Sequence, residues 1–210
     1  MMNVREALEA VRDRLRRHGA RDTAEHVLRV LRERWMPPWQ HLYWMPAAEV
    51  LRLAAPPDAS LRVIERFEDL SESERIDLAR HVGESSIGLA HARLERGCEL
   101  HLLLKGERIA GSRFVVFGRA HRFQGVVLTP RDTMGLDVRI ERELRGQGLA
   151  PLFFSLSIQD LHRRGCERVF AAVSVQNTPS IRTLERVGFR QILQFRIRRG
   201  WYRYDREVIR

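Results

Sequence analysis

The stretch Arg145-Gly146-Gln147-Gly148-Leu149-Ala150 decides how the chain is interpreted. Residues 136–140 before it alternate apolar and polar side chains as a strand does, and residues 151–164 after it carry apolar side chains at helical spacing. A strand, a glycine-containing turn and a helix together direct backbone N–H groups at an anion. Glycine lets a ligand approach the backbone closely. We therefore predict that this loop binds a phosphate or pyrophosphate group.

Two well-known phosphate loops do not fit this stretch. A Walker loop ends in Gly-Lys-Ser/Thr, which the chain lacks. A dinucleotide-binding loop needs three spaced glycines, and only Gly146 and Gly148 are present. The six residues alone would equally suit an ordinary turn at the start of a helix, so the neighbouring sequence has to decide.

The composition is that of a globular protein with a proper core. Hydrophobic residues make up 44% of the 210 residues and charged residues 30%. No apolar run approaches the roughly 20 residues that cross a bilayer, and the N-terminus lacks the apolar region of a signal peptide. The two cysteines, Cys98 and Cys166, have no partners at a zinc-binding spacing. We expect a cytoplasmic protein without a membrane span or a metal.

The first 60 residues differ from the remainder. Residues 3–18 and 23–35 each show a helical apolar face and are joined by a short turn, which predicts an antiparallel helical hairpin. Residues 35–46 are rich in tryptophan and proline, and we expect them to pack rather than to form a helix. The proline-rich residues 54–58 predict a boundary between an N-terminal helical extension, 1–60, and a main domain, 61–210.

The main domain alternates strands and helices in an order that predicts an α/β (α+β) fold. Residues 168–175 are strongly apolar and β-branched, which indicates a central strand. We predict strands at 61–67, 98–104, 108–117, 121–128, 136–140, 168–175, 189–198 and 201–209, and helices at 71–81, 86–96, 151–164 and 179–187.

A second motif follows the predicted central strand. Residues 177–189 read Asn-Thr-Pro-Ser-Ile and end in Gly188-Phe189, and this frame resembles the "N-x-x-x-I … GF" signature of the GNAT superfamily of acyl-CoA-dependent N-acetyltransferases. The frame Arg-x-x-Gly-x-Ala of residues 145–150 resembles the coenzyme A pyrophosphate loop of the same superfamily. The resemblance covers residues 61–210. It implies a mixed, mostly antiparallel central sheet with two splayed parallel strands and flanking helices.

The resemblance also implies a donor site for acetyl-CoA or another acyl-CoA, without a metal. In the family the pantetheine arm lies between the splayed strands, where Val138 and Ile140 would offer main-chain hydrogen bonds. Asn177 would contact the thiol end or cap the following helix, and both roles can coexist. The implied cofactor-binding residues are Val138, Arg139, Ile140, Arg145, Gly146, Gln147, Gly148, Leu149, Ala150 and Asn177.

The implied reaction is direct attack of a primary amine on the acyl-CoA in a ternary complex, which needs a base and an acid. Many family members carry a tyrosine as the acid, but this chain has Leu184 at that position. Asp137 and Glu141 are the candidate bases, and strand alternation places them on one face. His101 and His121 are further candidates, and a structural role is open for all four.

Two other functions stay open. A longer acyl chain carried by an acyl carrier protein would suit Ala171 and Ala172, which leave space, and the eight arginines in residues 186–210. An RNA- or aminoacyl-tRNA-directed or non-catalytic module would draw on the net charge of +10. We do not expect nucleic acid as a partner, because coenzyme A is itself a polyanion and residues 190–198 alternate as a solvated sheet face does.

No residue pattern identifies the acceptor, a small-molecule or polymer-borne amine. The sequence is compatible with a monomer or a homodimer.

Overall fold

A computed structural model describes residues 39–118, 122–123 and 126–195, together with Leu15, Ala20 and Ala24. Two compact units are distinguished, Met1–Trp39 with Arg196–Asp205, and Gln40–Phe195 with Arg206–Arg210. The account below concerns the described part of the second unit. The predicted helical hairpin and the predicted strand at 201–209 lie outside the described residues.

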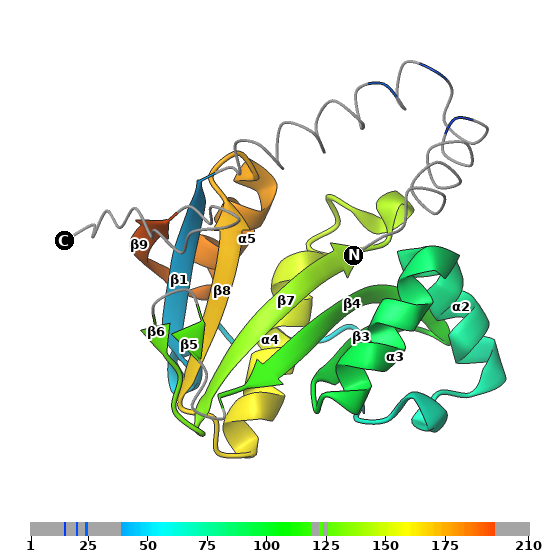
Figure 1. Ribbon diagram of the computed structural model, residues 1–210, viewed down its shortest axis with the longest axis horizontal. Helices are drawn as coiled ribbons and strands as arrows, with labels where there is room; N and C mark the ends of the chain where they lie inside the picture. The colour runs from blue at the N-terminus through cyan, green and yellow to red at the C-terminus, as the bar shows by residue number, and fades with distance from the viewer. Residues whose placement is uncertain are drawn as a thin grey trace. The chain divides into compact units, whose positions relative to one another are not determined.

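The second unit is built on a seven-stranded mixed sheet (Figure 1). Its order is β2-β3-β4-β7-β8-β1-β9, and only the β7–β8 pair is parallel. A separate hairpin of β5 and β6 replaces the one strand predicted at 121–128. The strands are β1 (Gln40–Pro46), β2 (Ala59–Ile64), β3 (Glu99–Lys105), β4 (Arg108–Phe117), β5 (Arg122–Phe123), β6 (Val126–Val127), β7 (Asp132–Ile140), β8 (Arg168–Ser174) and β9 (Arg190–Phe195).

Four α-helices and four short 3-10 helices accompany these strands in the described residues. Ser71 is the N-cap of the first of these α-helices, and its hydroxyl accepts a hydrogen bond from the Glu74 N–H as part of a capping box. The α-helices are α2 (Glu72–Val82), α3 (Ile87–Glu95), α4 (Leu149–Arg163) and α5 (Thr178–Val187). The 3-10 helices are η1 (Ala47–Glu49), η2 (Phe67–Asp69), η3 (Glu84–Ser86) and η4 (Arg142–Leu144).

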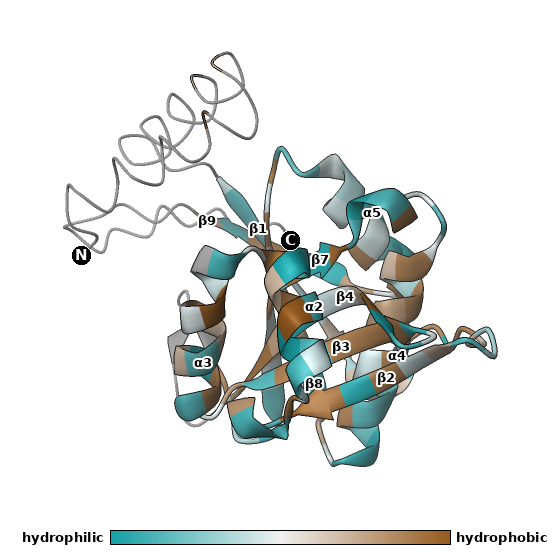
Figure 2. Cartoon of the chain, turned by 90° about the vertical axis from the view of Figure 1, so that its right-hand side faces the viewer, coloured by the Kyte–Doolittle hydropathy of each residue, from teal (hydrophilic) through white to brown (hydrophobic). Residues whose placement is uncertain are grey.

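Helices cover both faces of the sheet. On one face Leu78 of α2 and Leu94 of α3 pack with Leu102 of β3. On the other face Phe154 of α4 packs with Val169 of β8 and with residues of α5. Figure 2 shows brown, apolar strands between helices that carry teal residues on their outer sides. The predicted α/β fold with flanking helices is confirmed.

Strand β1 was not predicted. It lies between β8 and β9 and is antiparallel to both, although it precedes the boundary that we predict at residues 54–58. Leu42 and Tyr43 are both buried, and they pack on opposite faces of the sheet. A strand buried on both faces does not alternate apolar and polar residues, so β1 lacks the usual strand pattern. The prolines that flank it also argued against regular secondary structure in this stretch. The division at residues 54–58 stays a prediction, and β1 is part of the sheet.

The parallel strands β7 and β8 separate along their length. Their pairing runs from Asp132–Arg168 to Gly135–Ala171 and then stops. Figure 1 shows the two strands together at one end and diverging toward the other. The predicted splay is therefore present, and the point where it opens, which we call the fork, lies at Gly135 and Ala171.

Candidate functional site

A cleft of about 830 Å³ opens from the fork toward the start of α4 and the start of α5. It brings together all of the predicted cofactor-binding residues except Gln147, whose side-chain amide donates to the Glu143 carbonyl. Ala171 and Ala172, which we predicted to leave space for an acyl chain, also line it. Two motifs about thirty residues apart in the sequence thus meet at one site.

The glycine loop and the start of α4 form one side of the cleft. Gly146 and Gly148 have φ angles of 80° and 77°, a region that costs other residues about 1–2 kcal/mol. A Cβ at either glycine would meet no atom within 4 Å, so there is open space above the loop. Gly148 is the N-cap and offers no side-chain hydrogen bond. The first N–H groups of α4 therefore face this space without an intrahelical partner.

The charged residues that line the cleft are mainly positive. Arg139, Arg145, Arg182 and Arg186 line it, against Asp137 alone among the acidic residues. The Arg145 Nε donates to the Ile140 carbonyl at 3.0 Å, which ties the loop to the end of β7. The first turn of α4 contains no acidic residue. Clustered arginines and a helix N-terminus together favour a polyanionic ligand.

A β-bulge interrupts β7 just beyond the fork. Leu136 pairs with Phe114 and Arg139 with Ser112, so two residues of β7 stand opposite one residue of β4. The bulged residue Asp137 has a φ of 48°, the only positive φ of a non-glycine residue in the described chain. Bulges re-aim backbone groups and concentrate beside active sites. Asp137 and Val138, the two residues of the bulge, both line the cleft.

The two candidate carboxylates contact different helices. Asp137 lines the cleft and pairs with Arg93 of α3 at 2.6 Å. Glu141 does not line the cleft, and its Oε2 lies 2.9 Å from the Nδ1 of His81 on α2. The hydrogen bond from His81 holds the pKa of Glu141 below its usual range. The bulge at Asp137 interrupts strict alternation between the two residues, but α2 and α3, which supply their partners, pack on the same face of the sheet.

The link between α2 and the sheet was not predicted from the sequence. The ring of His81 connects Glu141 to Ser112, whose Oγ lies 3.1 Å from Nε2. Carboxylate, imidazole and hydroxyl in this order form the arrangement of a hydrolytic triad. Neither His81 nor Ser112 lines the cleft, and both side chains are buried. This chain of hydrogen bonds therefore joins α2 to the strands rather than to a substrate.

Helix α5 supplies two of the predicted positions. Asn177 lines the cleft, and its Oδ1 also accepts a hydrogen bond from the Ser180 N–H as the N-cap of α5. Leu184, which stands where many family members carry tyrosine, also lines the cleft and is 3% exposed. No tyrosine, histidine, lysine or cysteine occurs among the described residues that line the cleft.

A tyrosine does lie close to α5, on β1. Tyr43 is buried, and its hydroxyl donates to Glu185 at 3.2 Å. Burial and the neighbouring carboxylate raise the pKa of Tyr43 to about 12. Because it is held by Glu185 and does not line the cleft, Tyr43 does not take the place of the missing acid.

Comparison with known families decides what this cleft belongs to. The profile of the Acetyltransferase (GNAT) family matches residues 62–189. The chain belongs to the GNAT acetyltransferase family. That match covers more than half of the chain and includes both the glycine loop and the Asn177–Phe189 motif, so the resemblance stated from the sequence is confirmed.

Solved structures similar to this GNAT chain show the same fold. A glucosamine N-acetyltransferase region of a fungal multi-domain β-N-acetylglucosaminidase has a TM-score of 0.57 at 14% identity over 83% of this chain and 22% of its own. A GCN5-related N-acetyltransferase from Sphaerobacter thermophilus has a TM-score of 0.52 at 15% identity, with 80% and 53% covered. A tandem GNAT protein from the clavulanic acid biosynthesis pathway has a TM-score of 0.52 at 16% identity, with 73% and 50% covered.

The chain thus spans about half or less of the length of these three solved chains. At identities below 17% the likeness concerns the fold alone. No curated protein matches the chain.

His101, one of the two histidines proposed as bases, does not line the cleft of this GNAT chain. His101 is buried beneath α4, where its Nδ1 lies 2.8 Å from the Ser157 Oγ and its Nε2 3.1 Å from Glu99. Burial lowers the pKa of His101, so its ring is held neutral. His121 lies outside the described residues. His101 therefore has a structural role in the link between β3 and α4.

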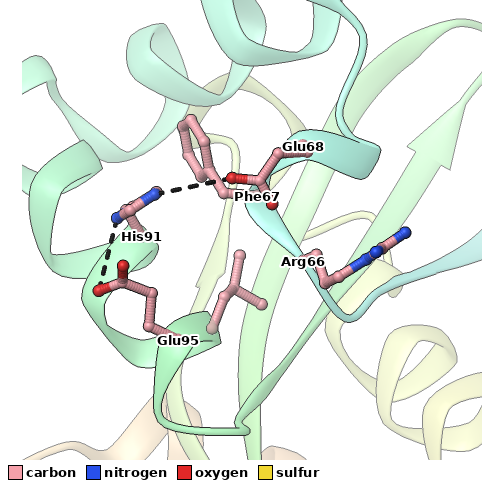
Figure 3. A pocket seen from close by; sticks show the side chains of 6 residues that line it. Arg66, Phe67, Glu68, His91 and Glu95 are labelled. Atoms are coloured by element: carbon pink, nitrogen blue, oxygen red, sulfur yellow. Dashed lines mark ion pairs between the residues drawn. The ribbon is translucent and has the colours of Figure 1, made fainter.

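A second, smaller hollow lies away from the cleft. A hollow of about 110 Å³ between η2 and α3 contains His91, whose ring lies between Glu68 and Glu95 at 3.9 and 3.7 Å (Figure 3). These side chains are largely exposed. No group of three or more potential metal ligands occurs in the described chain. Within the same residues, no helix has the length and apolarity that a membrane crossing requires.

Proposed function

We propose that this chain transfers an acetyl or other acyl group from acyl-CoA to a primary amine, which attacks the thioester directly. The observation that carries the proposal is the cleft at the fork, which runs from the glycine loop to Ala171 and is lined by four arginines. Its shape and charge suit a long polyanion with an apolar end. Family membership supports the transferase reaction, and acetyl-CoA is the usual donor of this family.

Different residues of the cleft would bind different parts of the acyl-CoA donor. The pyrophosphate would bind the first N–H groups of α4, above Gly146 and Gly148, with the charge of Arg145 alongside. The pantetheine arm would lie along Val138 and Ile140 in the space that β8 leaves open. Asn177 would contact the thiol end while still capping α5. No metal enters this scheme.

The bulge supplies the electrostatic part of the reaction. A main-chain N–H in the Asp137–Val138 segment would donate to the thioester carbonyl as negative charge develops there. Such a donor contributes roughly 3 kcal/mol in well-studied acyl transfer. The strained φ of Asp137 supports this role, because such strain persists mainly at functional sites.

Proton transfer would rest on few groups. Of the two carboxylates, Asp137 is the better-placed base because it lines the cleft, although it also forms an ion pair with Arg93. Glu141 is the weaker base because of its lowered pKa. With Leu184 in place of tyrosine, the departing thiolate would take its proton from water or from the cationic nitrogen that the attacking neutral amine leaves in the tetrahedral intermediate. Thiolates leave readily, so the transfer would be slowed rather than abolished.

Charge reversal at Arg145 tests the donor site. We expect Arg145→Glu to weaken acetyl-CoA binding roughly tenfold or more, because it removes a phosphate-facing charge and the hydrogen bond to the Ile140 carbonyl. Isothermal titration with acetyl-CoA measures this directly. The matched control is Arg142→Glu, the same charge change in the same loop at an exposed residue that does not line the cleft.

The control should bind within a few-fold of the parent. If the parent binds no acetyl-CoA, or if Arg145→Glu and Arg142→Glu bind as the parent does, the proposed function is wrong.

A further inference from the structure

Arg113 on β4 is a fully buried arginine without a hydrogen-bond partner. Its side chain is 0% exposed, and its Nε, Nη1 and Nη2 atoms all lack an acceptor. The guanidinium lies over the ring of Phe154, 4.9 Å from its centroid. That contact satisfies the face of the cation but none of its N–H groups, which lie in the guanidinium plane.

The tip of Arg113 lies at the fork of the splayed strands. A Cβ built on Gly135 would stand 2.3 Å from Nη2, so the tip occupies the space that a side chain at residue 135 would fill. Gly135 pairs with Ala171 in the last parallel pair before the strands separate. Gly135, Phe154 and Ala171 all line the cleft. Arg113 itself does not line the cleft, and its guanidinium lies behind the part of the cleft wall that Gly135 forms.

Among the described residues, no carboxylate pairs with the Arg113 guanidinium. The two buried carboxylates, Glu99 and Asp132, are engaged by Arg164 and Arg168. Burial lowers the pKa of Arg113 to about 10, which still leaves it protonated at neutral pH. An unpaired buried cation is among the costliest features that a fold can keep, and replacing one by an apolar side chain is commonly stabilising. Its presence at the fork therefore points to a ligand that completes it.

We propose that Arg113 binds a carboxylate at the far end of the acyl group, so that the donor is a CoA thioester of a short dicarboxylic acid. The inference rests on the proposed function and narrows its donor. With the thioester carbonyl at the bulge, the rest of the acyl group points toward Gly135 and the guanidinium. A carboxylate would accept two parallel hydrogen bonds from the guanidinium N–H groups, one on each oxygen, and would neutralise the positive charge. A single neutral carbonyl oxygen could not form this two-oxygen pair and would leave the charge in place.

Succinyl-CoA and butyryl-CoA form a matched pair for the test. Their acyl chains have the same number of carbons, and a carboxylate replaces the terminal methyl. We expect the parent to bind succinyl-CoA roughly tenfold or more tightly than butyryl-CoA, as a charge-assisted bidentate pair implies. Isothermal titration without an acceptor amine measures both affinities.

Arg113→Met keeps the length of the side chain and removes its charge. We expect this variant to bind coenzyme A as the parent does, to lose the preference for succinyl-CoA, and to melt at a higher temperature than the parent. The melting temperature shows that a lost preference does not come from misfolding. Arg163→Met, at an exposed arginine on the far end of α4, is the control and should keep the preference.

The outcomes separate this inference from the proposed function. If the parent binds coenzyme A but prefers butyryl-CoA or shows no preference, the inference is wrong and the proposed function stands. If Arg113→Met keeps the parent's preference, the inference is equally wrong. If the parent binds no CoA thioester, both fail together.

Discussion

Gly148→Asp is expected to weaken acyl-CoA binding roughly hundredfold while leaving the fold intact. The new carboxylate would stand at the start of α4, where we propose that the pyrophosphate binds, and like charges a few ångströms apart in a partly desolvated cleft repel by about 3 kcal/mol. Isothermal titration with acetyl-CoA gives the affinity, and thermal unfolding gives the stability.

The fold should tolerate this change for local reasons. Gly148 has a left-handed φ of 77°, a conformation that aspartate adopts more readily than most residues. A Cβ there meets nothing within 4 Å. Aspartate is also a favoured N-cap, and negative charge at a helix N-terminus is stabilising. We therefore expect the melting temperature to stay within a few degrees of the parent's.

Gly148→Asn is the matched control, because asparagine has the size and backbone tolerance of aspartate without its charge. We expect only a modest loss of affinity from the lost space. If the aspartate and asparagine variants bind acetyl-CoA equally well, the loop does not hold an anion, and the proposed placement of the pyrophosphate is wrong.

We expect Glu99→Gln to lower the free energy of unfolding by about 3 kcal/mol at neutral pH. Glu99 on β3 accepts two hydrogen bonds of 2.7 Å from Arg164 and lies 3.1 Å from the His101 ring. Burial alone would raise the pKa of Glu99, but the hydrogen bonds from Arg164 and His101 outweigh it and lower the pKa to about 2. Glutamine offers one acceptor oxygen and no charge to these donors.

The pH dependence of this contribution follows from the direction of the shift. The folded pKa of Glu99 lies below its ordinary value of 4.5, so the folded protein binds the proton less readily than the unfolded chain. The contribution is therefore complete above about pH 4.5 and declines as the pH falls toward 2. Urea unfolding of the parent and Glu99→Gln should show a constant difference from pH 7 to about 5.5, shrinking to roughly half or less by pH 3.

Glu95→Gln is the control for this pair. Glu95 is largely exposed, and its ion pair with His91 is long, at 3.7 Å. We therefore expect Glu95→Gln to change the free energy of unfolding by less than about 0.5 kcal/mol. A difference between parent and Glu99→Gln that stays unchanged down to pH 3 would contradict the low pKa of Glu99 as its cause.

The elements that could be predicted from the sequence are those whose signals are local. Three features act within a few neighbouring residues, so the local sequence pattern indicates them. They are the capping box at Ser71, the glycines at 146 and 148, and the asparagine before α5. Strand β1 could not be predicted. Its place between β8 and β9 depends on pairing with residues 168–174 and 190–195, which local composition does not encode.

The catalytic candidates show the same limit. Alternation placed Asp137 and Glu141 on one face, and their partners Arg93 and His81 belong to α3 and α2, which pack on the same face of the sheet. The bulge at Asp137 interrupts the strict period between them, and only pairing with β4 determines where a bulge falls. His81 became a partner of Glu141 only when α2 packed on the sheet. Arg113 could have been noticed, because alternation with Gly111 and Val115 puts a charge among inward-facing residues. Its lack of a partner is visible only in the folded chain.

By itself, the sequence determined the family and the glycine loop, and it indicated the residues that we propose bind a CoA thioester. These depend on short motifs, and the φ of Gly148 or the cap at Asn177 is set by neighbours in the chain. Only the tertiary structure decided that β1 completes the sheet, that Asp137 and Glu141 have separate partners, and that an unpaired guanidinium lies at the fork. Each of these depends on side chains far apart in sequence sharing one buried space, where charge and volume must be balanced by whatever the fold brings together.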